Sequence, residues 1–212
     1  MNPEEKSWLT KTAEVLSVIF HPLFMPLYGL LIIYSSPTLL SFIPAELKRL
    51  IFLLVLADNV LLPLAVASIL WVRGAITTFN ARDRNERVLL LTFALLMYSI
   101  TAYLLLRMHV PNLIKAYFIS LAVVTLITLL ITTFYKLSLH AAGIGGLLVL
   151  IIFMVVYYDI STVWQLTTVV IVGGAVMSSR IWLGDHSPSE VWSGLFAGAA
   201  VMALSLFLML RQ

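Results

Sequence analysis

The sequence predicts an all-α protein, a single polytopic bundle of about six or seven transmembrane helices occupying residues 1–212. Of its 212 residues, 61% are hydrophobic and only 11% are charged. Soluble domains average about 45–50% apolar and about 25% charged residues. The mean hydropathy of +1.04 agrees with lipid as the solvent. Uncharged stretches of about 20 residues, the length that spans a hydrocarbon core about 30 Å thick, recur along the chain.

Charged residues separate the predicted spans. Each span is expected to be helical, because backbone polar groups in lipid must be satisfied within the segment. This requirement overrides the β propensity of stretches rich in Val, Ile and Thr, such as residues 123–133. Asp58 and Asn59 interrupt the second span. The expected spans are residues 15–34, 50–72, 88–106, 116–135, 137–158, 160–179 and 191–210.

The charge and cysteine content exclude several classes of function. The net charge is +3, but the 13 lysines and arginines are spread over several short loops. A nucleic-acid partner needs a clustered basic face and is therefore not expected. Cations beside anionic headgroups fit membrane lipids as partners instead. Without cysteine, the chain has no disulfide framework, zinc–thiolate site or thiol nucleophile.

Three polar clusters stand out between the apolar spans, at residues 82–87, 136–140 and 180–190. Two predicted spans separate the first cluster from the second, and two separate the second from the third. Because an even number of crossings returns the chain to the same face, all three clusters are expected to meet at one membrane surface. Lysine and arginine counts do not decide which face this is, since many of those cations belong to the clusters themselves.

The third cluster contains the most specific pattern. Arg180 ends one apolar stretch, and His186 and Glu190 lie four residues apart at the start of the next. That spacing places them on one helix face, where Glu190 can hold the imidazole in one tautomer. Ser187 and Glu190 also fit a capping box, so Glu190 is open to both interpretations. Arg180 is close enough in sequence to bind an anion held at His186.

The second cluster is typical of an anion site at a helix start. Lys136, Ser138 and His140 precede a long apolar stretch, and the amino end of a helix attracts anions through its free amides and its dipole. A lysine, a hydroxyl and a histidine suit a phosphate. The alternative is a lysine that extends to the headgroups and a helix-packing patch formed by Gly143 and Gly146.

The first cluster is rich in arginine, the side chain best suited to bidentate phosphate binding. Arg82, Arg84 and Arg87 alternate with Asp83 and Glu86. Local ion pairing in a solvated loop is the alternative interpretation. We take Arg84 and Arg87 as candidate phosphate ligands.

Residues 179–190 resemble the third signature of the type 2 phosphatidic acid phosphatase superfamily. That signature reads Ser-Arg, five residues, His, three residues, Asp. The sequence motif Ser-Arg-Ile-Trp-Leu-Gly-x-His-x-Pro in this chain is especially similar to the corresponding segment of bacterial undecaprenyl-pyrophosphate phosphatases of that superfamily.

The other two family signatures are matched only in part. The second, Pro-Ser-Gly-His, is matched by Ser138 and His140, with leucines in place of proline and glycine. The first is Lys, six residues, Arg-Pro. Arg87 matches its arginine, whereas Asn80 and Val88 replace its lysine and proline.

The resemblance implies a metal-independent phosphatase that acts on a lipid phosphate or pyrophosphate and needs no cofactor. His186 would be the nucleophile and form a phosphohistidine. Glu190, in place of the family's aspartate, would orient it, and His140 would protonate the leaving oxygen. The family also implies a bacterial cytoplasmic membrane, with the site facing the periplasm or exterior. The expected phosphate-binding residues are Arg180, Lys136, Arg87, Arg84 and Ser138.

Other functions remain open at this stage. A family member can bind or transport lipid phosphates without hydrolysing them, and Leu139 in place of glycine makes that a serious alternative. A transporter would use intramembrane polar residues such as Asp58 and Asn59. His21 and His109 lie beside prolines and are interpreted as structural.

A metal site is the third alternative. His140, His186 and Glu190 supply the ligand types of a two-histidine, one-carboxylate site. The neighbouring cations Arg180 and Lys136 disfavour a divalent ion there.

Overall fold

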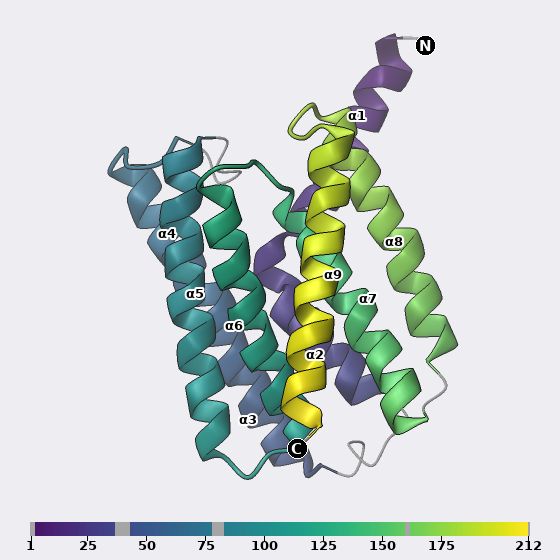
Figure 1. Cartoon of the computed structure of the whole chain (residues 1–212). Helices are drawn as coiled ribbons and strands as arrows, with labels where there is room; N and C mark the ends of the chain where they lie inside the picture. The colour runs from purple at the N-terminus through teal and green to yellow at the C-terminus, as the bar shows by residue number, and fades with distance from the viewer. Residues whose placement is uncertain (1–2, 37–42, 78–82, 160–161, 212) are drawn as a thin grey trace.

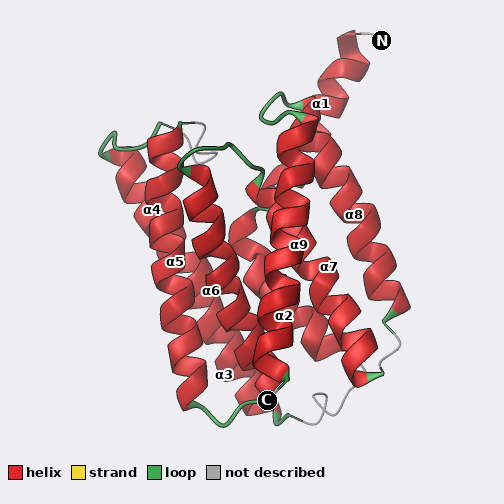
Figure 2. Ribbon diagram, viewed as in Figure 1, coloured by secondary structure: helices red, strands yellow, loops and turns green. Residues whose placement is uncertain are grey.

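The computed structural model describes residues 3–36, 43–77, 83–159 and 162–211. In these ranges the chain forms helices joined by short loops (Figure 2), which confirms the predicted all-α class. The elements are α1 (Pro3–Ile19), η1 (Pro22–Phe24), α2 (Met25–Ser35), α3 (Ala45–Leu56), the π-helical turn η3 (Ala57–Leu61), α4 (Leu62–Val72), α5 (Arg84–Arg107), α6 (Asn112–Thr132), α7 (Leu139–Tyr158), α8 (Val163–Trp182) and α9 (Pro188–Leu210).

Within the described ranges, six helical segments are long and apolar enough to cross a membrane, and the chain is an integral membrane protein. They are the segments α1–α2 and α3–α4 and the single helices α5, α6, α7 and α9. The predicted span at residues 160–179 corresponds to α8, a helix of 20 residues. It is not among the six and carries Gln165 and Arg180, which lower its apolar content.

The first membrane segment is not the continuous helix that its hydropathy predicts. It breaks at His21, whose backbone is extended (φ −62°, ψ 143°), before the short turn η1. Pro22 causes the break, because a proline disfavours helical backbone at the preceding residue and has no N–H to donate. The chain resumes as α2 at Met25. Non-helical backbone at this depth requires protein or a cavity around it rather than lipid.

The second membrane segment contains a π-helical turn at Asp58 and Asn59. The backbone N–H of Leu62 donates to the carbonyl of Ala57, five residues earlier. Pro63 has no N–H for the ordinary helical bond at the next position, which favours a bulge here.

The predicted loop before this segment is shorter than expected, because α3 already begins at Ala45.

Three loops that are far apart in the sequence lie at one end of the bundle. They join α4 to α5, α6 to α7 and α8 to α9, at the end near the N-terminus, whereas the C-terminus lies at the opposite end (Figure 1). This arrangement agrees with the even-crossing prediction that brings the three polar clusters to one face. Arg82 of the first cluster, and Asn80 at the lysine position of the family signature, lie outside the described residues.

Helices α7 and α9 pack with their backbones in direct contact. A Cβ on Gly198 would lie 2.1 Å from the carbonyl oxygen of Ala142, and one on Gly145 would lie 2.2 Å from that of Leu195. Small residues permit this close approach between membrane helices. The predicted patch of Gly143 and Gly146 faces methionine side chains instead. The contact fixes the starts of α7 and α9 relative to each other.

Helix α6 lies in the centre of the bundle. Tyr117 and Phe118 are fully buried there, and the Tyr117 hydroxyl donates to the Met25 carbonyl at 2.8 Å. This bond ties α6 to the start of α2, just after the break in the first segment. The break at His21 is therefore held by the core.

Candidate functional site

The turn between α8 and α9 is shaped by Gly184. Its φ of +68° lies in the left-handed region, which glycine adopts without strain. The Gly184 N–H donates to the carbonyl of Ile181 at 3.0 Å, and the His186 N–H donates to that of Arg180 at 3.3 Å. The turn thereby reverses the chain within a few residues and brings His186 back beside Arg180.

Asp185 joins two of the candidate phosphate ligands. Its carboxylate lies 2.8 Å from a guanidinium nitrogen of Arg180, and both side chains are almost fully buried. Its backbone carbonyl accepts a hydrogen bond from Lys136 Nζ at 2.8 Å. The second and third polar clusters are therefore in direct contact. Sequence reasoning missed Asp185, because its partners depend on the geometry of the turn.

His186 and Glu190 form the pair that their spacing predicts. His186 Nδ1 lies 3.0 Å from Glu190 Oε2. The same carboxylate oxygen accepts the backbone N–H of Ser187 at 3.2 Å, and Ser187 Oγ accepts the N–H of Glu190 at 3.4 Å. The Glu190 carboxylate therefore has both predicted roles: it closes the capping box, and it orients the imidazole of His186. With Nδ1 engaged, Nε2 is the nitrogen left for chemistry.

Burial lowers the pKa of His186 below its ordinary value of 6.5. The hydrogen bond with Glu190 raises this pKa, whereas the charges of Arg180 and Lys136 lower it further. The net effect favours a neutral imidazole with a free lone pair on Nε2. A neutral imidazole is the form that a nucleophile requires.

His140 is held by the first helix. Its Nε2 lies 3.0 Å from the carbonyl oxygen of Ser17 in α1. A carbonyl can only accept, so Nε2 is the donor in this bond, and Nδ1 is the nitrogen available for other contacts. His140 is 6% exposed, at the first turn of α7. The bond positions its ring at the candidate site.

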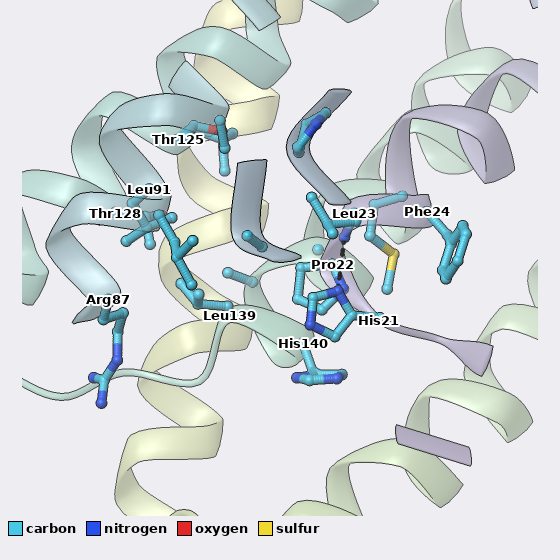
Figure 3. Close-up of a pocket in the computed structure, with 18 of the residues that line it drawn as sticks. His21, Pro22, Leu23, Phe24, Arg87, Leu91, Thr125, Thr128, Leu139 and His140 are labelled. Atoms are coloured by element: carbon cyan, nitrogen blue, oxygen red, sulfur yellow. Dashed lines mark hydrogen bonds between the residues drawn. The ribbon is translucent and has the colours of Figure 1, made fainter. Parts of the chain in front are cut away.

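A cavity of about 690 Å³ connects this polar end to the interior of the bundle. Figure 3 shows Arg87 and His140 near one end of it, with Leu91 and Thr125 further along. Most of the wall is apolar and comes from α4, α5, α6 and the His21–Met25 stretch. The charged or imidazole-bearing residues that line it are His21, Arg87, Lys136, His140, Arg180, Asp185 and His186.

Two of the predicted phosphate ligands do not reach the cavity. Ser138 is fully buried as the N-cap of α7, and its N–H donates to the carbonyl of Glu190 at 3.0 Å. It ties α7 to α9 and is not among the described residues that line the cavity. Arg84 is exposed in the first turn of α5 and is likewise not among them. Arg87, one turn further into α5, is buried and lines the cavity.

His21 is the second residue that sequence reasoning missed, because it was interpreted as structural. It does cap η1, since its Nδ1 accepts the N–H of Leu23 at 3.3 Å. It also lines the cavity, and its ring lies edge-on to that of His140, with 5.5 Å between centroids. The available signal was a His-Pro pair inside an apolar stretch long enough to span the membrane. His109 is exposed, beyond the end of α5.

The intramembrane pair Asp58 and Asn59 makes contacts between helices. Thr101 donates its hydroxyl hydrogen to Asp58 and accepts from Asn59 Nδ2 at 2.8 Å. None of the three is among the described residues that line the cavity. This agrees with the interpretation that they bond neighbouring helices.

The metal-site alternative is not supported by the geometry. Within the described ranges, no three histidine or carboxylate side chains lie close enough together to hold a metal ion. His140 contacts Ser17, whereas His186 contacts Glu190.

In comparisons with known protein families, with characterised proteins and with solved structures, the chain gives no match.

Proposed function

We propose that the protein is a membrane-embedded phosphatase that hydrolyses a lipid phosphate or pyrophosphate through a phosphohistidine on His186. The observation that carries the proposal is the oriented His186–Glu190 pair at the polar end of an apolar cavity. Arg87, Lys136 and Arg180 reach the same cavity from three different parts of the chain. This combination suits a lipid with an anionic headgroup.

The chemistry would use these side chains in separate roles. His186 Nε2 attacks phosphorus while Glu190 supports the charge that develops on the imidazole. The three cations neutralise the phosphoryl oxygens, which is the main requirement of phosphoryl transfer. His140 gives a proton from Nδ1 to the leaving oxygen. Water then hydrolyses the phosphohistidine. Since the cations of the chain hold the oxygens, the reaction is expected to need no metal.

The candidate substrates include isoprenyl pyrophosphates and phosphatidic acid, because they share the reacting group. We place the protein in a bacterial cytoplasmic membrane, with the site facing the periplasm or exterior, on the resemblance of the Ser179–Glu190 segment alone. A non-catalytic protein that binds or transports lipid phosphates is the second candidate. It is favoured by Leu139, which stands where the family signature has glycine.

Phosphate release by the purified protein tests the proposal. The assay would use detergent, EDTA and a panel of lipid phosphates and pyrophosphates, with wild type, His186→Ala and the exposed His109→Ala as the control. We expect release that survives EDTA, persists in His109→Ala and falls by about 10⁴-fold or more in His186→Ala, as for loss of other nucleophiles. Binding of these lipids without release would reject the enzyme and leave the binding protein.

A further inference from the structure

His21 is a cavity residue for which the mechanism above has no role. It lies where the first membrane segment is broken, between α1 and η1, and it lines the same cavity as His186 and Arg180. The core holds this break in place through the bond from Tyr117 to Met25. The position of the ring is therefore fixed, which a hydrogen-bonding role requires.

The contacts of His21 determine which of its nitrogens carries the proton. Nδ1 accepts the N–H of Leu23 at 3.3 Å, so Nδ1 is unprotonated and the proton resides on Nε2. Figure 3 shows the ring between the backbone of Leu23 and the ring of His140. The Nε2–H is therefore not engaged by η1, and it belongs to a ring that lines the cavity. His21 presents a neutral N–H donor in a fixed direction.

His21 lies at the boundary between the polar and apolar parts of the cavity. Figure 3 shows His140 on one side of the His21 ring and Pro22 and Leu23 on the other. The cavity lining includes the cations Arg87, Lys136 and Arg180 as well as apolar residues of α4, α5 and α6. When a lipid phosphate fills the cavity, its phosphoryl group lies among the cations and its tail lies among the apolar residues. The atom at the boundary is the oxygen that joins phosphorus to the lipid.

The geometry points to His21 as a further catalytic residue, whose Nε2–H donates a hydrogen bond to the oxygen that leaves when His186 attacks phosphorus. This inference rests on the proposed function. In this step the lone pair of His186 Nε2 forms the N–P bond, and the electrons of the P–O bond pass to the leaving oxygen. That oxygen takes the proton from His140 Nδ1, while the N–H of His21 binds it. A neutral imidazole is an effective electrophile of this kind.

The two histidines then divide the work through their backbone contacts. His140 Nε2 bonds to Ser17, so a second proton on Nδ1 makes it the acid. His21 Nδ1 is occupied as an acceptor, so its N–H stabilises negative charge without being transferred. The lipid portion leaves with one proton, and water later supplies the hydroxyl that releases phosphate from His186 and returns a proton to His140.

The test compares two substrates that differ in how much help the leaving oxygen needs. The leaving group of a lipid monophosphate is the alkoxide of the lipid alcohol, a strong base. The leaving group of p-nitrophenyl phosphate is nitrophenolate, a much weaker base. The variants are His21→Asn and His21→Ser, because both residues are good N-caps and retain an acceptor for Leu23. Neither places a donor where the imidazole Nε2–H lies. His109→Asn, outside the site, is the matched control.

We expect His21→Asn and His21→Ser to lower kcat for the lipid monophosphate by about 10²-fold, the effect of losing one preorganised donor. For p-nitrophenyl phosphate the loss should be less than about threefold, because nitrophenolate leaves without an acid or a donor. The ratio of the two rates is taken within one variant, so a lower folded fraction cancels.

The remaining outcomes decide against either the assignment of His21 or the proposed function. Equal losses on both substrates in both variants would overturn the assignment, because a structural or general phosphate-binding role affects the two reactions alike. Unchanged rates on both would overturn it as well. A wild-type protein that releases phosphate from neither substrate would instead overturn the proposed function. The control His109→Asn should match wild type on both substrates.

Discussion

Two buried carboxylates in this protein have very different surroundings. Asp185 is paired with Arg180, bonds Lys136 through its backbone and lines a cavity. Asp58 is bound by the hydroxyl of Thr101 between helices, away from the described cavity lining. Both are intramembrane or interfacial charges of the kind that usually marks function. The comparison teaches that access to the cavity and the identity of the partner separate a carboxylate of the candidate site from one that joins two helices.

The largest effect is expected from Arg180→Gln, which removes the ion-pair partner of Asp185 in the cavity. Losing one phosphoryl-binding donor should lower kcat/KM for lipid phosphate by about 10²–10³-fold. Breaking the buried pair with Asp185 should also destabilise the protein by about 3–5 kcal/mol. Phosphate release and unfolding in mixed detergent measure the two effects. Arg211→Gln, at the exposed C-terminal end, is the control.

The double variant Arg180→Gln, Asp185→Asn sharpens the result. Removing both charges should restore much of the stability, because no buried charge is left unpaired, but none of the activity. Restored activity in the double variant would contradict phosphate binding by Arg180.

The next largest effect is expected at the contact between α7 and α9, which holds the second and third polar clusters together. In Gly198→Ala, the new Cβ would lie 2.1 Å from the carbonyl oxygen of Ala142. We expect a loss of about 3 kcal/mol in the free energy of unfolding, since backbone cannot move aside as a flexible side chain can. Gly174→Ala is the matched control, because its Cβ meets no atom within 4 Å. A Gly198→Ala protein as stable as the control would contradict the backbone contact between α7 and α9.

A smaller effect is expected at the other carboxylate. Asp58→Ala leaves the Thr101 hydroxyl without this acceptor and should cost about 1 kcal/mol, typical of polar contacts between membrane helices. Phosphate release should keep its KM, with the exposed Glu46→Ala as the control. If Asp58→Ala abolished activity or substrate binding while the fold persisted, Asp58 would belong with Asp185, and the transport alternative would gain support.

The smallest effects concern pH. Because the pKa of His186 is below 6.5, the acid limb of kcat/KM should lie below pH 6.5. Glu190→Gln removes an influence that raises this pKa, so the limb should move to lower pH. Lys136→Met removes one that lowers it, so the limb should move to higher pH. A pH–rate profile of each variant checks the two opposite directions, and shifts in the same direction would contradict the assignment to His186.

The same pKa fixes the sign of the stability change. Between the lowered pKa and 6.5, the unfolded chain binds more protons at His186 than the folded one. The contribution of His186 to stability therefore rises with pH through that window and is level above it. On acidification below pH 6.5, the protein should lose stability through this group.

Sequence periodicity was sufficient for the global arrangement and for one contact of the site. The apolar stretches predicted the helices, and the even number of crossings predicted the shared face. The i, i+4 spacing predicted the pair of His186 and Glu190, because the capping box at the start of α9 holds the residue before Ser187 close to Glu190. Contacts set by irregular backbone were not predictable in this way.

Three residues illustrate that limit. Asp185 reaches Arg180 only because Gly184 adopts positive φ. Hydropathy averaged over a window conceals the break at His21. Ser138 is in a motif that suggests phosphate binding, but the close packing of α7 on α9 buries it as a cap. In each case tertiary geometry, rather than residue type, decides the role.

The cavity also sets a length scale for whatever occupies it. On α5 its lining residues run from Arg87 to Tyr98, a rise of roughly 16 Å at about 1.5 Å per residue. This is close to half of a hydrocarbon core about 30 Å thick. A lipid anchored by its headgroup at Arg87 therefore meets protein walls along one leaflet, and any longer tail continues into the bilayer. If the occupant is a lipid, selectivity by chain length should end at that depth, so an analogue shortened only to that length would keep all the protein contacts of a longer one.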